Sequence, residues 1–439
     1  MRQKICLVYP QQTKLPSEWN KVTNIAPPQI PLPPLGLLYI IANSKHEIDF
    51  IDNRIQKLSI PQLVEATKHY DFVGFGGTIF EANEAIQTSK QLMSLGIKTI
   101  YGGANATVNP ELYTNNFTYI FRGEADLEFD NFISNPKPIY TAKRITNLDQ
   151  IKFPAREKID LSKYYRQNEY LTKYPIDTVV TSRGCPFDCA FCSSKWLWER
   201  RFTARSTENI MQEIEFLIHN HGTKGFYFRE DNFTVNRNRV IDFCNAIKKY
   251  QVEWVCESRV DTVDKELLTL MKSAGLKGIW FGIESTRNDH LKLMNKGITI
   301  EKAKETINIC KELGIKCGGG FIIGLPWETE SDMLSTGTEA RKFNLDIVFF
   351  NRLYAIPKSQ VHSIIVTEKL KKYETDNIIL ANTRTVDADR VTQIYYDTAY
   401  PKQVKILRLL KPLVPIIKKF PRLHKLAINI YSKMKTKTI

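Results

Sequence analysis

Short apolar segments alternate with longer segments of helical periodicity through the first third of the chain. Such alternation predicts parallel strands joined by helices, that is, a doubly wound α/β sheet. The predicted strands are residues 4–9, 47–52, 71–76, 98–101 and 119–122, and the predicted helices lie near residues 35–44, 61–69, 81–95 and 125–134. Sheets of this kind bind ligands beyond the C-terminal ends of their strands. We assign this domain to residues 1–135.

A second series of strands and helices runs from residue 177 to residue 357. Its first four strands are predicted at residues 178–181, 225–228, 253–256 and 278–283, and a fifth begins at Gly320. Repeated strand–helix units predict a partial (β/α)6 barrel, whose chemistry takes place at the C-terminal strand ends. We assign the barrel to residues 176–360, and the mixed, polar residues 136–175 to an interdomain linker.

The strand–helix alternation fades after residue 359, and residues 361–439 are predicted to form a small basic helical region. Lys and Arg number 11 between Thr398 and Ile439, a stretch without Asp or Glu, so this tail carries most of the net charge of +15. Charge concentrated in this way argues against general nucleic-acid binding. Basic amphipathic helices can rest on an anionic membrane surface. Packing on the barrel with a solvated basic face is an equal alternative, and RNA contact is a third interpretation.

The sequence contains no apolar run long enough to cross a bilayer. Its first residues lead directly into a predicted strand, without the architecture of a signal peptide. We therefore expect a cytoplasmic protein, with peripheral contact at the inner face of the membrane if the tail binds lipid. Thiols stay reduced in that compartment, where an iron–sulfur cluster can also persist.

Three cysteines, Cys185, Cys189 and Cys192, lie within eight residues directly after the first barrel strand. This spacing lets one loop direct three thiolates at a cubic iron–sulfur cluster and leaves one iron without a protein ligand. Zinc would require a fourth ligand at a compatible spacing, and no second pair of the CxxC type follows. A disulfide between such close neighbours would be strained and would leave one thiol over. The pattern therefore predicts a 4Fe-4S cluster.

The CxxxCxxC motif, with the aromatic residue Phe191 before its last cysteine, resembles the signature of radical S-adenosylmethionine (SAM) enzymes. The resemblance implies that SAM occupies the open iron and that one electron from the cluster cleaves it to a 5′-deoxyadenosyl radical. It also implies an oxygen-sensitive enzyme that receives this electron from a reductant such as flavodoxin or ferredoxin. Phe191 itself becomes a candidate SAM contact.

The strand ends that follow the cysteine loop supply further candidates for SAM binding, in the order that the same family uses. Acidic residues after the second strand would accept hydrogen bonds from the SAM amino group, and an arginine after the third could pair with its carboxylate. The resemblance places polar groups after the fourth strand at the ribose, and the Gly-x-Ile-x-Gly-x-x-x-Glu pattern of the fifth at the adenine. The candidates are Glu230, Asp231, Arg259, Glu284, Ser285 and Gly324. For the two acidic residues after the second strand, a solvated turn is the alternative.

Glycine-rich sequences close the third and fourth strands of the first domain, and Arg-Gly-Glu closes the fifth. Glycines there let the backbone approach a bulky ligand, although helix–strand packing explains such pairs as well. In this order the features resemble the cobalamin-binding, Rossmann-like domain that precedes many radical SAM domains. That subgroup contains the class B radical SAM methylases and the anaerobic magnesium-protoporphyrin ester cyclase. The candidate cobalamin contacts are Gly76, Gly77, Thr78, Gly102, Gly103, Ala104, Thr107 and Glu124.

One sequence feature of the wider cobalamin-binding fold is missing, because Asp-x-His-x-x-Gly does not follow the first strand. The corresponding loop reads Pro10-Gln11-Gln12-Thr13-Lys14, so no histidine is positioned to ligate cobalt from below. Members of the radical SAM subgroup often lack this histidine, and cobalamin stays the expected cofactor. A Rossmann-like domain kept only for packing or substrate binding is the alternative.

The resemblance implies an enzyme that removes hydrogen from an unactivated carbon, to which methylcobalamin then delivers a methyl group. The substrate is expected to be a small or lipid-like molecule, and the sequence assigns no catalytic side chain. Two other enzymatic outcomes stay open, namely cyclisation or rearrangement with the same cofactors, and radical chemistry without cobalamin. A membrane- or RNA-binding protein with a structural cluster is the non-enzymatic alternative.

Overall fold

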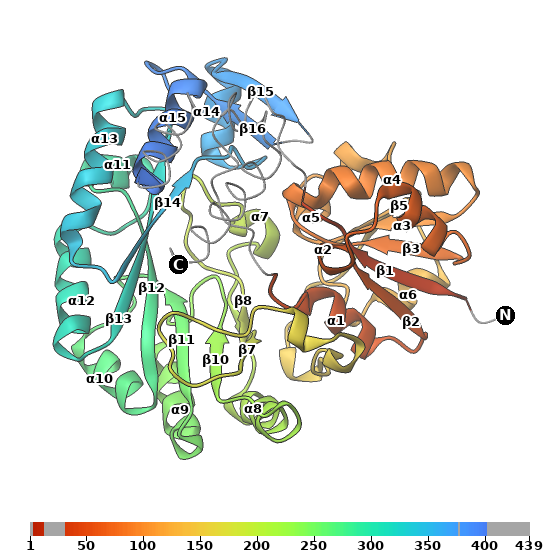
Figure 1. The fold of residues 1–439 in the computed structure, drawn as a ribbon, viewed down its shortest axis with the longest axis horizontal. Coiled ribbons are helices and arrows are strands. Elements are labelled where there is room, and N and C mark those ends of the chain that lie inside the picture. Colours follow the sequence, from red (N-terminus) through yellow and green to blue (C-terminus); the bar gives the residue numbers. More distant parts are fainter. Residues whose placement is uncertain (1–2, 13–30, 376–377, 402–439) are drawn as a thin grey trace, which may run out of the picture.

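Two six-stranded sheets dominate the computed structural model, which describes residues 3–12, 31–375 and 378–401 (Figure 1). The first sheet, in red and orange, lies beside the second, in green and blue. Every strand pairing within the two sheets is parallel. This arrangement confirms the predicted fold class, a doubly wound sheet followed by a partial (β/α) barrel.

The first sheet has the strand order β2-β1-β3-β4-β5-β6. Its strands are β1 (Ile5–Tyr9), β2 (Ile48–Asp52), β3 (Phe72–Phe75), β4 (Lys98–Tyr101), β5 (Tyr119–Arg122) and β6 (Ile139–Thr141). The five predicted strands are all present, and β6 is a sixth that the sequence analysis did not predict. The order reverses between β1 and β3, which is the place where doubly wound sheets bind ligands.

Helices cover both faces of the first sheet. They are α1 (Leu35–Asn43), α2 (Asn53–Gln56), α3 (Ile60–Thr67), α4 (Ala82–Ser94), α5 (Ala104–Val108) and α6 (Phe129–Ser134). Because side chains alternate along a strand, Ile5 and Leu7 of β1 pack with α1 and α6 on one face. Cys6 and Val8 pack with α3 and α4 on the other face. Burial on both faces explains why the strand is a continuous apolar run.

The second sheet follows the chain, in the order β7-β10-β11-β12-β13-β14, with β7 and β14 at its edges. Its strands are β7 (Ile176–Val179), β10 (Gly225–Phe228), β11 (Glu253–Ser258), β12 (Leu276–Glu284), β13 (Lys316–Ile323) and β14 (Ile347–Arg352). The helices are α7 (Ser194–Trp198), α8 (Thr207–His221), α9 (Arg237–Ile247), α10 (Lys265–Ser273), α11 (Asn288–Leu293), α12 (Ile300–Glu312) and α13 (Glu330–Glu339). A short antiparallel ribbon, β8 (Ser182–Arg183) with β9 (Thr203–Ala204), flanks the cysteine loop and α7.

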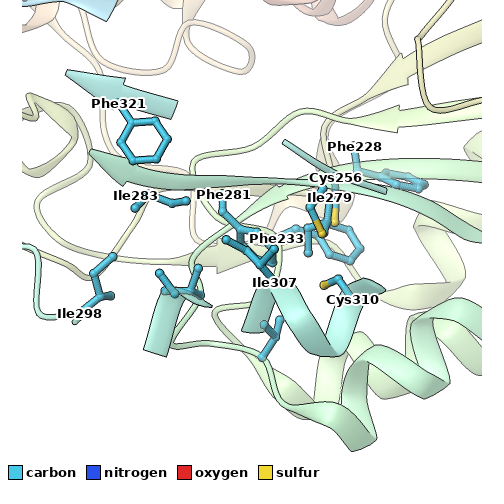
Figure 2. Packing of buried hydrophobic residues seen from close by; sticks show 14 of the residues in the cluster. Phe228, Phe233, Cys256, Ile279, Phe281, Ile283, Ile298, Ile307, Cys310 and Phe321 are labelled. Atoms are coloured by element: carbon cyan, nitrogen blue, oxygen red, sulfur yellow. The ribbon is translucent and has the colours of Figure 1, made fainter. Parts of the chain in front are cut away.

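The largest apolar core lies between the second sheet and its outer helices (Figure 2). Phe228 of β10 packs against Phe233 and Trp254, with ring centroids 5.4 and 5.7 Å apart. Further along the sheet, Phe281 of β12 and Ile307 of α12 belong to the same buried cluster. Each such side chain contributes roughly 1.5–3 kcal/mol on burial. The core therefore holds the strand ends in fixed positions, and the loops after them start from a rigid base.

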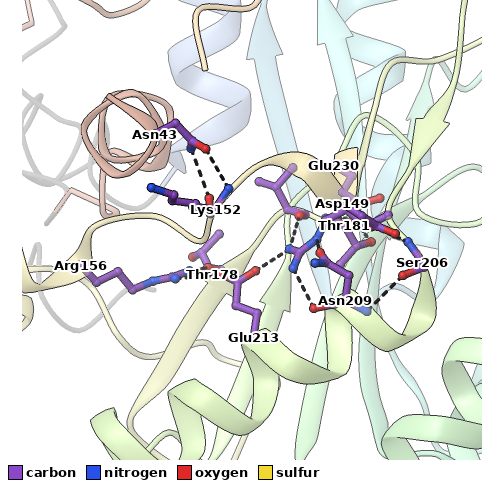
Figure 3. Close-up of polar contacts among 12 residues, drawn as sticks. Asn43, Asp149, Lys152, Arg156, Thr178, Thr181, Ser206, Asn209, Glu213 and Glu230 are labelled. Carbon is purple, nitrogen blue, oxygen red and sulfur yellow. Dashed lines mark hydrogen bonds and ion pairs between the residues drawn. The ribbon is translucent and has the colours of Figure 1, made fainter. Parts of the chain in front are cut away.

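The predicted interdomain linker, residues 136–175, contributes β6 to the first sheet and packs against both cores. Its Arg156 is fully buried and donates to Oε1 of Glu213 in α8 and to the carbonyl oxygen of Thr178, at 2.8 Å each (Figure 3). Glu213 also pairs with Arg205. Burial alone would raise the pKa of Glu213, but the charges of the two guanidinium groups outweigh it and the pKa is lowered. This buried pairing fixes the connecting segment to the barrel.

Beyond the barrel, the described chain forms α14 (Gln360–Thr367), β15 (Lys371–Thr375), β16 (Ile378–Ala381) and α15 (Ala388–Ala399). The antiparallel β15–β16 hairpin was not predicted, because only helices were expected here. Its Tyr373 and Leu380 cluster with Phe80 of the first domain, whose ring meets Tyr354 edge-on at 5.4 Å. Most of the predicted basic tail, residues 402–439, lies outside the described residues. Within the described ranges, no helix is long and apolar enough to cross a membrane.

Candidate functional site

A cavity of about 900 Å³ lies between the two sheets, at the C-terminal ends of their strands. The loops after β3, β4 and β5 line it from the first sheet, and the loop after β10 and helix α7 line it from the barrel. All eight residues predicted to contact cobalamin line this cavity: Gly76, Gly77, Thr78, Gly102, Gly103, Ala104, Thr107 and Glu124. Glu230 and Asp231, predicted to contact SAM, line its barrel side. The structure thus brings residues of two predicted sites to one space.

Glycines keep the floor of the cavity free of side chains. A Cβ at Gly76 would lie 2.7 Å from Cδ2 of Leu37 in α1. Gly103 has a φ of +96°, and a Cβ there would lie 3.1 Å from the carbonyl oxygen of Gly77. Residues other than glycine rarely adopt this backbone conformation. Gly76 is buried and lets α1 pack closely on the sheet, whereas Gly103 is exposed and offers its backbone to a bulky planar group such as a corrin.

Two threonines at the cavity hold the loops that surround it. The backbone N–H and Oγ1 of Thr78 donate to Oε2 of Glu81 at 2.7 and 2.6 Å. Thr107 Oγ1 donates to the carbonyl oxygen of Gly103 at 2.8 Å and accepts from the N–H of Gly123 at 3.0 Å. The second pair of bonds joins the loops after β4 and β5, so the conformation of one loop depends on the other.

Glu124 connects the first sheet to the barrel. Its Oε1 accepts from Nη1 of Arg183 at 2.8 Å, and its Oε2 accepts from the N–H of Ile145 at 2.8 Å. Arg183 also forms a two-point pair with Asp126, at 2.9 Å for each bond. Burial alone would lower the pKa of Arg183, but the two carboxylates outweigh it and the pKa is raised. Since Arg183 stands two residues before Cys185, this ion pair joins the cavity wall to the cysteine loop.

Each of the three predicted cluster ligands has a hydrogen-bond donor at its sulfur. Cys185 and Cys192 each accept from the backbone N–H two residues further along, at 3.3 Å for Cys192. Cys189 accepts from Nη1 of Arg259 at 3.5 Å. Burial raises the pKa of Cys192 to about 11 and that of Cys185 above its ordinary value. Donors to sulfur are characteristic of iron–sulfur ligands, so the loop fits a cluster.

No set of three or more Cys, His, Asp or Glu side chains among the described residues is placed to hold a single metal ion. A cubic cluster differs from such a site because it distributes three protein ligands over three iron atoms. The donors to sulfur in the cysteine loop therefore fit a cluster better than a single ion.

The loop after α11 clamps the cysteine loop. The N–H of Ala190 donates to the carbonyl oxygen of Met294 at 2.8 Å, and Nδ2 of Asn295 donates to the carbonyl oxygen of Asp188 at 2.8 Å. On the other side, the carbonyl oxygen of Ala190 accepts from the N–H of Val361 at 3.0 Å. The middle of the cysteine loop is thus fixed by segments that precede α12 and begin α14.

Lys296 lies at the centre of the predicted SAM contacts. Its buried ammonium is 3.1 Å from Oε1 of Glu284 and 5.8 Å from the ring centroid of Phe191. Its carbonyl oxygen accepts from Nη2 of Arg259 at 2.5 Å. Nε and Nη2 of Arg259 donate to the two carboxylate oxygens of Asp261, at 2.9 and 2.8 Å. The structure therefore brings three predicted contacts together through a lysine that the sequence analysis did not single out.

Glu230 and Asp231 differ in what surrounds their carboxylates. Oε1 of Glu230 accepts from both the N–H and the hydroxyl of Thr181, and Oε2 accepts from the hydroxyl of Ser182. Asp231 accepts from the N–H of Gly184 at 3.2 Å. Burial raises the pKa of Asp231. Glu230 thus secures the start of the cysteine loop, whereas Asp231 carries fewer protein hydrogen bonds.

The remaining predicted SAM contacts follow β12 and β13. Ser285 is buried, and Gly324 has a φ of +97°. The N–H of Gly324 and that of the next residue donate to Oε2 of Glu328, at 2.7 and 2.8 Å. Oε1 of Glu328 lies 3.9 Å from Nδ1 of His290, and neither of these two buried atoms has a hydrogen-bond partner. Burial raises the pKa of Glu328 to about 7.

A protein-family model described as the radical SAM superfamily matches residues 179–339. The matched segment begins at the end of β7, contains the cysteine loop and ends with α13. Residues 179–339 form a radical SAM domain. The sequence motif of three cysteines and the five barrel strand ends therefore belong to one radical SAM domain.

Similarity to known proteins extends beyond the radical SAM domain. An uncharacterized methyltransferase of Pyrococcus horikoshii is 28% identical over 385 residues, which are 78% of this chain and 82% of that protein. The anaerobic magnesium-protoporphyrin IX monomethyl ester cyclase of Rubrivivax gelatinosus is 28% identical over 70% of this chain and 61% of its own length. The cobalamin-dependent SAM radical enzyme OxsB, solved with aqua-cobalamin and SAM bound, has a TM-score of 0.71 over 99% of this chain and 71% of that one, at 16% identity. The chain therefore shares the two-sheet fold of OxsB.

Proposed function

We propose that this radical SAM enzyme binds a 4Fe-4S cluster, SAM and cobalamin, and methylates an unactivated carbon of a small molecule. One observation carries the proposal. The glycine-lined strand ends of the first sheet and the ends of β7, β10 and β11 in the barrel line a single cavity. Cofactors held by the two sheets would therefore meet over one substrate, in a space that closes off water.

The cluster would be held by Cys185, Cys189 and Cys192. When bound, the cluster supplies the electron that cleaves SAM, and cobalamin supplies the methyl group. The hydrogen bonds to sulfur support this assignment, because they favour thiolates and fix their directions. Arg259 would act at the cluster rather than on the SAM carboxylate, since its fork is already taken by Asp261.

SAM would lie along the barrel strand ends, from Asp231 after β10 to Gly324 after β13. Asp231 is the better candidate for the amino group, because both oxygens of Glu230 already accept from the start of the cysteine loop. Between these ends, Glu284 and Ser285 would face the ribose. The contact of Lys296 with Glu284 supports this, because it fixes the direction of one carboxylate at the strand end.

Cobalamin would occupy the cavity on the side of the first sheet, over the glycines that follow β3 and β4. Gly102 and Gly103 line the cavity, and Gly103 is exposed there. The described residues that line the cavity include no histidine. Arg54 stands 3.7 Å over the ring of Tyr9 at the end of β1, beside the same floor. We infer that the chain holds the corrin by backbone and polar contacts around its edge.

Anaerobic reconstitution tests the proposal. With iron, sulfide, dithionite and SAM, the enzyme should release 5′-deoxyadenosine, and Cys189→Ala should abolish this release. Cys244→Ala, which changes a buried thiol of α9 outside the loop, should retain it. Hydroxocobalamin should bind with a change in its absorbance. Protein that carries zinc or no metal, or whose spectrum does not change when SAM is added, would contradict the proposal.

Cyclisation or rearrangement is a second candidate outcome, favoured by the 28% identity to the cyclase. Mass spectrometry of the product distinguishes the two, because methyl transfer adds one carbon and cyclisation adds none. The absorbance of bound cobalamin separates both from radical chemistry without that cofactor.

We further propose a cytoplasmic location with membrane contact through the basic tail. The proposal rests on the sequence alone, since residues 402–439 lie outside the described ranges. Lys and Arg on amphipathic segments are attracted to anionic lipid. A chain truncated after Tyr400 should lose binding to anionic liposomes that the full chain retains. Equal partitioning of the two would contradict the idea.

A further inference from the structure

Two exposed arginines lie directly over the cysteine loop, at the edge of the cavity. The side chains of Arg200 and Arg201 are 57% and 66% exposed. Nε of Arg200 donates to the carbonyl oxygen of Pro186 at 3.3 Å, and Pro186 follows Cys185 directly. Glu199, which directly follows α7, is the last residue of this segment that lines the cavity. The two guanidinium groups therefore face solvent next to the first predicted cluster ligand.

The backbone that presents these arginines is strained. Glu199 and Arg200 are consecutive residues with φ of +52° and +56°, in the left-handed region that side chains disfavour. Glu199 is the C-cap of α7, where a left-handed residue commonly ends a helix. The backbone of the turn packs against Gly184, since a Cβ at that glycine would collide with the carbonyl oxygen of Arg201. We call residues Glu199–Arg201 the arginine turn.

The surroundings of the arginine turn are positively charged. Asp188 serves two cations, because its Oδ1 lies 2.7 Å from Nζ of Lys195 and its Oδ2 lies 3.8 Å from the first arginine. Glu199 lies 3.7 Å from the second arginine. The exposed Lys358 is adjacent to this region, since its carbonyl oxygen accepts from the indole of Trp196 at 2.8 Å. Lys195, Arg200 and Arg201 thus outnumber the two carboxylates with which they pair.

We propose that the arginine turn is the docking site for the protein that reduces the cluster, a small acidic one-electron carrier such as flavodoxin. The inference rests on the proposed function. A protein donor cannot enter the cavity and must approach the cysteine loop from solvent, where the arginine turn lies. Complementary charge accelerates such encounters by 10- to 10³-fold. In the step itself, the carrier loses one electron and the cluster gains it, with no group transferred.

Reversing the charge of the arginine turn tests whether it docks a protein donor or instead acts on the cysteine loop itself. The cluster-loaded full chain is mixed anaerobically, at low ionic strength, with either reduced flavodoxin or dithionite. Arg200→Glu/Arg201→Glu should slow reduction by flavodoxin by about tenfold or more, and should leave reduction by dithionite unchanged. Arg200→Gln/Arg201→Gln should fall between this variant and the wild type. Lys248→Glu/Lys249→Glu, with the same charge change at the N-terminal side of β11, should match the wild type.

Added salt should bring the rate of the wild-type chain with flavodoxin toward that of the charge-reversed variant, because exposed charges are screened. The inference is overturned if flavodoxin reduces the variant as fast as the wild type. It is also overturned if both donors slow equally, since the turn would then act on the cysteine loop itself. A wild-type chain that dithionite cannot reduce would instead refute the proposed function, and the docking site with it.

Discussion

Arg183 and Asp126 form a two-point ion pair between the barrel and the first sheet, with both nitrogen–oxygen distances at 2.9 Å. Arg183 belongs to β8, two residues before Cys185, and Asp126 lies two residues after Glu124. Both side chains are largely buried, at 13% and 8% exposure. Arg183 therefore joins the cysteine loop to the cavity wall, together with Arg144, whose Nη2 donates to the carbonyl oxygen of Arg183 at 3.3 Å.

Asp126→Asn removes the charge that pairs with Arg183 and keeps the shape of the side chain. It should therefore weaken the contact between the cysteine loop and the cavity wall. The substitution leaves a buried guanidinium short of one charge, which destabilises the protein by about 3 kcal/mol. We expect a lower unfolding midpoint and weaker binding of hydroxocobalamin, whereas release of deoxyadenosine continues. Glu266→Gln, in the exposed pair with Arg237, should change neither property measurably. An Asp126→Asn enzyme that binds hydroxocobalamin like the wild type would show that the pair does not support the cavity.

The positions of the glycine-rich strand ends could be predicted from the sequence. Parallel strands bring their C-terminal ends to the same edge of a sheet, so Gly76 and Gly103 had to lie close together once their strands were identified. The cysteines were predictable for a related reason, because all three lie on one short loop. In both cases the decisive contacts are local in sequence or follow from the sheet itself.

The partners of single side chains could not be predicted. Glu230 accepts hydrogen bonds from Thr181, which lies 49 positions away, and Glu124 pairs with Arg183, 59 positions away. A local sequence pattern does not indicate which residue so far along the chain will be the partner. The β15–β16 hairpin was missed for the same reason, since its Leu380 is buried by contacts with the first domain. Hydrophobic periodicity indicates which face of a helix or strand is buried, but not which other element packs against that face.

Gly184→Ala should prevent the cysteine loop from closing. Gly184 has a φ of +91°, and a Cβ there would collide with the carbonyl oxygen of Arg201. Backbone must move to relieve that contact, so we expect the iron content after reconstitution to fall to near zero. Gly222→Ala is the matched control, because Gly222 has a φ of +62° and open space around it. This control should cost only about 1–2 kcal/mol of stability and should retain iron.

Lys296→Met should weaken SAM binding and leave the cluster intact. The substitution removes the cation between Glu284 and Phe191 and leaves a carboxylate without its partner. We expect the Kd for SAM to rise roughly tenfold, the effect of one charge-assisted hydrogen bond. Lys292→Met, at an exposed position of α11, should bind SAM normally. Equal affinity of both variants would exclude a positioning role for Lys296, and loss of iron would assign it to the cluster loop.

Glu328 gives the protein a pH-dependent stability. Its buried carboxyl has a pKa raised to about 7 from an ordinary value of 4.5. Between these values the unfolded chain has released the proton and the folded chain still holds it, so the folded state loses stability as pH rises. The full loss, reached above pH 7, corresponds to about 3 kcal/mol.

Glu328→Gln should remove this pH dependence while keeping the oxygen that accepts from the N–H of Gly324. The new amide would also point a donor at Nδ1 of His290, which now has no partner. The unfolding midpoint of the variant, relative to the wild type, should therefore rise between pH 5 and pH 7 and level off above pH 7. Glu266→Gln, at an exposed glutamate, should show a constant difference over the same range. A constant difference for Glu328→Gln would mean that this carboxyl is ionised in the folded protein throughout, with a counter-charge or water at its second oxygen.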